Sequence, residues 1–164
     1  MSFQISRARV LAIAAFSIAG VTAEANECKQ IVTQLNGSTF PCAESPVGLC
    51  ADGEITSGLL KGIKSLVYTS AAFSAGLATE PPTVLSYSAD AIFSTDQGDL
   101  YLTQVAVSDT SRRVFTEINR IVGGTGRFEG ASGNLFISGT VDSSDLVTDF
   151  ESEITGAVCL SESV

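Results

Sequence analysis

The chain has 164 residues, 45% of them hydrophobic, and it carries 18 acidic against 9 basic side chains for a formal net charge of −9. Its length lies within the usual range for one domain with one sizeable core. A negative charge of this size repels phosphate backbones and anionic lipid headgroups, which argues against nucleic-acid and membrane-surface partners. The sequence contains no histidine, which removes the commonest general base and the usual Ser-His-Asp and Cys-His arrangements.

The first 25 residues have the features of a secretory signal peptide. Two arginines precede an apolar run over about 10–21, and the small-x-small site Ala23-Glu24-Ala25 follows. A run of roughly a dozen residues is too short to span a bilayer of about 30 Å as a helix, so a retained anchor is the lesser alternative. We expect cleavage of 1–25 and an exported domain over 26–164, secreted or periplasmic, with no membrane span.

Four cysteines follow the expected cleavage site, and an even number in an exported chain indicates two disulfides with three possible connectivities. We expect Cys42 to pair with Cys50, because they bracket a short segment that contains proline and glycine. We expect Cys28 to pair with Cys159, because that bond would join the two ends of the domain. A four-cysteine zinc site is the rival interpretation, and the absence of any Cys-x-x-Cys pair weakens it.

Residues 36–53 hold three glycines and two of the four prolines and lack strand alternation. This composition predicts an ordered, disulfide-clipped loop at one rim of the domain, with either a functional or a purely structural role. Asn36-Gly37-Ser38 matches the N-glycosylation acceptor pattern, which matters only in a eukaryotic source. The Ala-rich signal peptide is more typical of a bacterium.

From residue 54 onward, short β-branched and aromatic runs alternate with Gly, Asp and Ser, and no stretch shows a convincing 3.6-residue period. The pattern predicts an all-β domain. The expected strands are about 28–35, 54–60, 63–75, 83–95, 99–108, 113–123, 132–142 and 147–159. Because barrel closure removes the exposed edges of an open sheet, tight connections between eight strands favour a single antiparallel up-and-down β-barrel.

Two segments, 84–93 and 146–159, separate the two sheet faces most clearly. The expected buried faces carry Leu85, Tyr87, Ala89, Ala91 and Phe93 in the first, and Phe150, Ile154 and Val158 in the second. The expected opposite faces carry Ser86, Ser88 and Asp90, and Asp149, Glu151 and Glu153. Between two such strands, 95–99 reads TDQGD, which suits a tight hairpin with one residue at positive φ.

The most informative segment is 123–133, which reads GGTGRFEGASG and precedes the strand-like NLFISGTV. Five glycines around one aromatic let the backbone leave one strand, turn compactly and enter the next. A phosphate-binding P-loop does not fit, because the Gly-Lys-Ser/Thr and a following helix are both missing.

This segment resembles the GG(S/T)GxFxxAxG signature shared by the allene oxide cyclase family and the plant dirigent proteins. The resemblance covers about 120–141 and implies an eight-stranded antiparallel barrel. It marks as fold-defining Gly123, Gly124, Gly126, Phe128, Gly130 and Gly133, and it transfers no catalytic residue. The segment 49–62 is also similar to the start of small exported bacterial proteins of the allene oxide cyclase-like barrel group.

Any catalysis would have to use carboxylates, tyrosines, arginines or backbone dipoles in a shielded cavity. The candidates within strands are Tyr68, Tyr87, Asp90, Tyr101, Glu117, Asn119 and Arg120, and those ranked first are Glu117, Asp90, Tyr87 and Tyr101. Glu117 and Arg120 lie three apart and face opposite sides of an ideal strand, so at most one is a site residue. The simpler interpretation, which we favour, makes charged candidates such as Glu117 and Asp90 outward-facing solvated groups or paired charges at the rim of the barrel.

Acidic residues in turns raise the alternative of a calcium site. The candidates are Asp142, Asp145 and Asp149, or Asp96 and Asp99. Calcium prefers oxygen ligands, but no calcium-loop pattern is met, so no metal and no cofactor is predicted.

Two functions fit these features. An eight-stranded barrel either fills its lumen with side chains or holds one small ligand, so the first function is binding of a small apolar molecule, or a structural role. The resemblance alone implies the second, a cofactor-independent cyclase or isomerase, or a dirigent-type stereochemical guide. A buried carboxylate opposite a tyrosine in a roomy lumen would favour the enzyme, and a packed lumen would exclude both ligand functions. Association into a homo-oligomer stays open.

Overall fold

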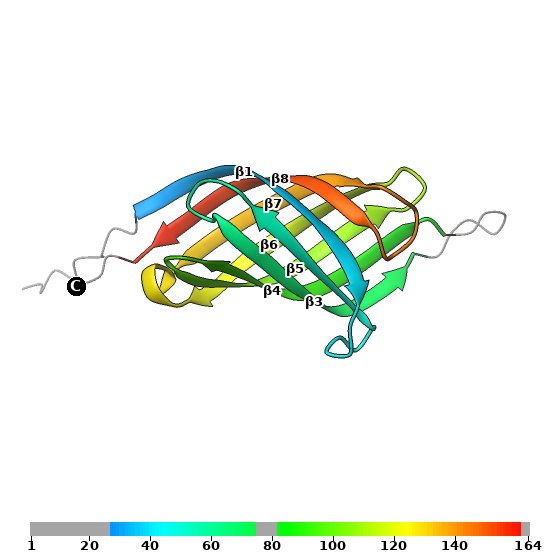
Figure 1. Ribbon diagram of the computed structural model, residues 1–164, viewed down its shortest axis with the longest axis horizontal. Helices are drawn as coiled ribbons and strands as arrows, with labels where there is room; N and C mark the ends of the chain where they lie inside the picture. Colours follow the sequence, from blue (N-terminus) through cyan, green and yellow to red (C-terminus); the bar gives the residue numbers. More distant parts are fainter. Residues whose placement is uncertain (1–26, 75–81, 162–164) are drawn as a thin grey trace, which may run out of the picture.

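The computed structural model of the protein describes residues 27–74 and 82–161, so the expected signal peptide lies outside the described residues. Eight antiparallel strands follow one another around a closed barrel, each paired with the next, and the last strand pairs with the first (Figure 1). The predicted fold class is confirmed. No helix in the described part of the chain is long and apolar enough to cross a membrane.

The strands are β1 (Glu27–Pro41), β2 (Leu49–Ile55), β3 (Gly62–Phe73), β4 (Val84–Thr95), β5 (Gly98–Asp109), β6 (Val114–Gly124), β7 (Ser132–Val141) and β8 (Asp149–Leu160), with a short 3₁₀ helix η1 (Gly126–Phe128) after β6. From β3 onward they lie within about two residues of the expected ranges. The faces of β4 and β8 alternate as predicted. The hairpin between β4 and β5 is also confirmed, with Gly98 at a φ of 131°.

The loop expected over 36–53 is wrong in extent. β1 continues to Pro41 and β2 begins at Leu49, which leaves only 42–48 as a connection. The cause is a glycine pair: Gly37 lies opposite Gly53, and a Cβ on Gly37 would come within 2.1 Å of the Asp52 carbonyl oxygen. Because glycine has no side chain, a paired glycine shows neither an apolar nor a polar face in the sequence. The strand segments around Gly37 and Gly53 therefore lack the alternation that would have predicted them.

Both expected disulfides are present. Cys28–Cys159 joins directly paired positions of β1 and β8 across 131 residues, and Cys42–Cys50 clips the short connection. By loop-closure entropy the long bond contributes about 5 kcal/mol and the short one about 2.5 kcal/mol. With all four sulfurs bonded, the zinc interpretation is wrong. Two disulfides are consistent with an oxidising compartment.

The glycine-rich segment between β6 and β7 closes one end of the barrel. Gly126 and Gly130 adopt φ values of 56° and 69°, which a glycine adopts without strain, and η1, which begins at Gly126, places Phe128 inside with 0% of its surface exposed. The Thr125 N–H donates to the Asp99 carbonyl at 2.8 Å and fixes the segment to β5. Figure 1 shows this segment in yellow at the end where β1 begins and β8 finishes. We call this the sealed end, and the opposite end the open end.

Candidate ligand cavity in the barrel lumen

The two halves of the lumen differ. The half next to the sealed end is filled by fully buried side chains, which include Leu60, Phe93, Leu100, Phe128 and Leu135. The other half contains a cavity of about 70 Å³ whose lining reaches the exposed residues Asp145 and Leu146 at the open end. The lumen is therefore packed at one end and hollow at the other.

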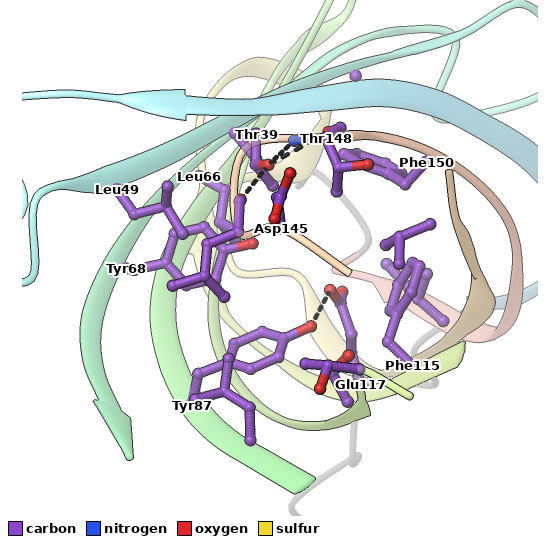
Figure 2. A pocket seen from close by; sticks show the side chains of 18 of the residues that line it. Thr39, Leu49, Leu66, Tyr68, Tyr87, Phe115, Glu117, Asp145, Thr148 and Phe150 are labelled. Carbon is purple, nitrogen blue, oxygen red and sulfur yellow. Dashed lines mark hydrogen bonds between the residues drawn. The ribbon is translucent and has the colours of Figure 1, made fainter. Parts of the chain in front are cut away.

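The wall of the cavity is mainly apolar and aromatic. Aliphatic side chains from several strands line it, among them Leu35, Leu49, Leu66, Leu85 and Ile137. Tyr68 and Tyr87 form a tilted pair with ring centroids 5.2 Å apart, and Phe115 and Phe150 form an edge-on pair at 6.0 Å. Figure 2 shows the tyrosines on one side of the cavity and the phenylalanines across from them.

Two loops are fastened to strands that line the cavity. Thr39 accepts a hydrogen bond from the Thr148 N–H at 2.9 Å and donates one to the Leu146 carbonyl at 2.5 Å, which holds the β7–β8 loop (142–148) against β1. The clipped loop 42–48 is held by Ser45, whose hydroxyl donates to the Tyr68 carbonyl at 2.6 Å. The clipped loop is thus anchored to the strand that carries one of the cavity tyrosines.

A buried polar layer crosses the middle of the lumen, made of Lys64, Gln104, Glu117 and Asn119. Lys64 Nζ lies 2.9 Å from Glu117 Oε2, and each residue is only 5% exposed. Lys64 also donates to Gln104 Oε1 at 3.2 Å, and Asn119 Nδ2 donates to Glu117 Oε2 at 3.4 Å. Because a buried charge is stable only when it is paired and hydrogen-bonded, each of the two ions keeps the other inside the barrel.

Lys64 and Glu117 both line the cavity, so the polar layer forms its floor. Tyr87 reaches the same group, with its hydroxyl donating to Glu117 Oε1 at 3.3 Å (Figure 2). Burial and then the negative charge of Glu117 raise the pKa of Tyr87 and Tyr68 well above the usual range. Both phenols are therefore neutral hydrogen-bond donors across physiological pH.

Some hydrogen-bonding capacity in this region is unused. Gln104 Nε2 and Asn119 Oδ1 are buried without a partner among the described residues. Lys64 directs two N–H groups to protein acceptors in the described part of the chain, whereas an ammonium group has three. Of these residues only Lys64 lines the cavity, so its third N–H is the group that can still bind a polar atom entering there.

The structure brings only some of the predicted site residues together. Those in or beside the lumen are Glu117, Tyr87, Tyr68 and Asn119, whereas Asp90 and Arg120 are exposed and Tyr101 is half-buried away from the cavity. The favoured interpretation of outward, solvated groups holds for Asp90 and is wrong for Glu117, which is buried in the lumen. The reason is that Lys64, on a strand across the lumen, offsets the cost of removing the Glu117 carboxylate from water. The sequence of the strand that carries Glu117 gives no sign of this partner.

Sequence reasoning missed Lys64, Gln104, Phe115 and Phe150 as lining or floor residues. A signal for Lys64 existed, because it shares the inward phase of β3 with Leu66 and Tyr68. A lysine in the buried phase of a strand indicates a carboxylate partner inside the domain.

The acidic turn residues do not form a metal site in the described part of the chain. The one group there with metal-ligand spacing is Cys42, Glu44 and Cys50, and its two sulfurs are bonded to each other.

No family model, no curated protein and no solved structure matches this chain. Its class is therefore given by its own architecture: a disulfide-linked, eight-stranded antiparallel barrel, sealed at one end, with a cavity above a buried ion pair.

Proposed function

We propose that this protein is exported and binds one small, largely apolar molecule in the open half of its barrel. The observation that carries the proposal is the cavity itself, with apolar and aromatic walls above a polar floor. Ligand sites commonly have this composition, in which the wall supplies affinity and a few polar groups fix orientation. The features of 1–25 and the two disulfides support export.

The size of the cavity favours a compact ligand. A buried water needs roughly 10–15 Å³ of such volume, so about 70 Å³ corresponds to about five to seven waters, or to a molecule with a similar number of non-hydrogen atoms. Apolar area removed from water contributes about 25 cal/mol per Å² to binding, before the entropy of association is subtracted. A compact molecule with one polar end fits the cavity better than a long acyl chain does.

Native mass spectrometry of protein purified from its own secretion medium tests the proposal, with the denatured sample alongside. We expect a small bound mass, or one gained after incubation with apolar metabolites, that is lost on unfolding. Ala51→Leu adds a side chain to the cavity wall and should weaken binding by about tenfold or more. Ser65→Leu, which places the same leucine side chain on the outer face of β3, should leave binding unchanged. Equal binding by both variants would place the ligand elsewhere.

A second candidate function is cofactor-independent isomerisation or cyclisation of the bound molecule. The observation that favours it is Glu117 beside the neutral phenol of Tyr87 at the cavity floor. A carboxylate and a neutral hydroxyl can exchange protons with a ligand held above them. Deuterium from D₂O should then enter a bound ligand, and Glu117→Gln should stop the exchange while binding persists. Recovery of every ligand without deuterium would leave binding as the function.

A further inference from the structure

Lys64 is a buried primary amine at the floor of a cavity that reaches solvent, with only 5% of its surface exposed. We propose that it captures a small aldehyde as a protonated imine, with Glu117 as the counter-ion. This inference rests on the proposed binding function and specifies its ligand class. Lysines that form imines with carbonyl compounds commonly sit in such shielded pockets.

Charge on the floor selects an uncharged ligand. Lys64 and Glu117 together are formally neutral, so an anionic ligand would meet the Glu117 carboxylate and a cationic ligand would meet the Lys64 ammonium. A carbonyl group brings no charge, and its oxygen can accept a hydrogen bond. The Tyr68 hydroxyl lines the same cavity and makes no hydrogen bond to another described residue, so it is placed to donate one.

The chemistry balances within the residues present. Glu117 Oε2, 2.9 Å away, takes a proton from Lys64 Nζ, and the freed amine lone pair adds to the carbonyl carbon. The nitrogen loses a proton to the former carbonyl oxygen, which gives a carbinolamine. The Glu117 carboxyl then returns its proton to that hydroxyl group, the C–O bond breaks, water leaves, and a C=N bond forms.

The net reaction converts an ammonium and an aldehyde to an iminium and water. No oxidant or reductant is needed. One positive and one negative charge face each other before and after the reaction, so the barrel interior gains no net charge. The iminium nitrogen stays within reach of the carboxylate that paired with the ammonium.

The chain supplies internal controls. Besides Lys64 it has two lysines. Lys29 is half-buried beside Glu27, and Lys61 is exposed. Neither lines the cavity. Any aldehyde reacting simply with accessible amines would therefore modify these two before Lys64.

The test treats the folded protein with hexanal and cyanoborohydride, which reduces an imine to a stable amine, and maps the product by peptide mass spectrometry. We expect Lys64 to be modified at least about tenfold faster than Lys61, because the cavity holds the aldehyde against this amine. Hexan-1-ol, a matched non-carbonyl ligand, should slow modification of Lys64 and leave that of Lys61 unchanged. Guanidinium should abolish the preference.

Modification of Lys29 or Lys61 as fast as Lys64 would overturn the inference. If hexan-1-ol binds by native mass spectrometry and Lys64 stays unmodified, the imine is wrong and the binding function stands. If neither hexanal nor hexan-1-ol binds and no lysine is modified preferentially, both the imine and the proposed binding function are wrong. Lys64→Met and Lys61→Arg complete the set: only the first should remove the preferred product, and the primary measurement uses the unaltered chain.

Discussion

Replacing Lys64 with methionine removes the cation from the polar layer and leaves the Glu117 carboxylate buried. The carboxylate then keeps only two long hydrogen bonds in the described structure, from Tyr87 at 3.3 Å and Asn119 at 3.4 Å. Loss of one partner of a buried ion pair costs about 3–5 kcal/mol. In a domain of this size each kcal/mol lowers Tm by about 2–4 °C, so we expect a fall of roughly 10 °C.

The matched variant is the double replacement Lys64→Met with Glu117→Leu. Substituting apolar side chains of similar volume for both ions should recover most of the loss, with a coupling free energy of about 2 kcal/mol or more between the two sites. Guanidinium unfolding followed by circular dichroism, with the disulfides intact, gives all four stabilities of the cycle. Single variants that each cost less than about 1 kcal/mol, or losses that simply add, would mean that the pair is solvated and that the polar layer is not a dry floor.

Three further outcomes follow from the fold. Gly37→Ala should destabilise the protein by at least several kcal/mol, because its Cβ would lie 2.1 Å from a carbonyl oxygen. Gly48→Ala, which has open space around its Cβ and a φ of 76°, should cost only about 1–2 kcal/mol, and the denaturant midpoints of the two variants test this difference. Raised pKa values of Tyr68 and Tyr87 mean that the unfolded chain loses these protons near pH 10 and the folded chain does not, so stability should hold below pH 10 and fall above it, and the phenolate absorbance of these two residues should rise as the protein unfolds. Serine in place of both cysteines of the β1–β8 disulfide should cost about 5 kcal/mol, twice the cost for the 42–50 bond, and the reverse order would contradict the loop-closure account.

The local patterns in the sequence were sufficient for most of the architecture. In β4 the inward face from Leu85 to Phe93 is an unbroken alternation, because that strand has lumen on one side and solvent on the other. The hairpin at Gly98 and the turns of the glycine-rich segment follow from backbone angles that favour glycine. These features depend on neighbours in the chain, which the sequence displays.

The candidate site was predicted less completely, because its determinants act between strands far apart in sequence. Glu117 and Tyr87 were named, but the burial of Glu117 depends on Lys64, which is 53 residues away along the chain and meets it only after closure. The difference between a packed and a hollow half depends on how side-chain volumes from all eight strands add together in the lumen. No single strand carries that information.

Which end of the barrel is sealed also determines where a tag can be attached without blocking the cavity. Glu27 and Leu160 are paired at the sealed end, so both ends of the folded domain leave it there, opposite the mouth of the cavity (Figure 1). A tag or surface linker fused at either end of the folded domain is therefore attached on the side away from the cavity mouth. Protein immobilised through such a linker would present the cavity mouth to the flowing solution, an orientation suited to measuring the binding of small molecules.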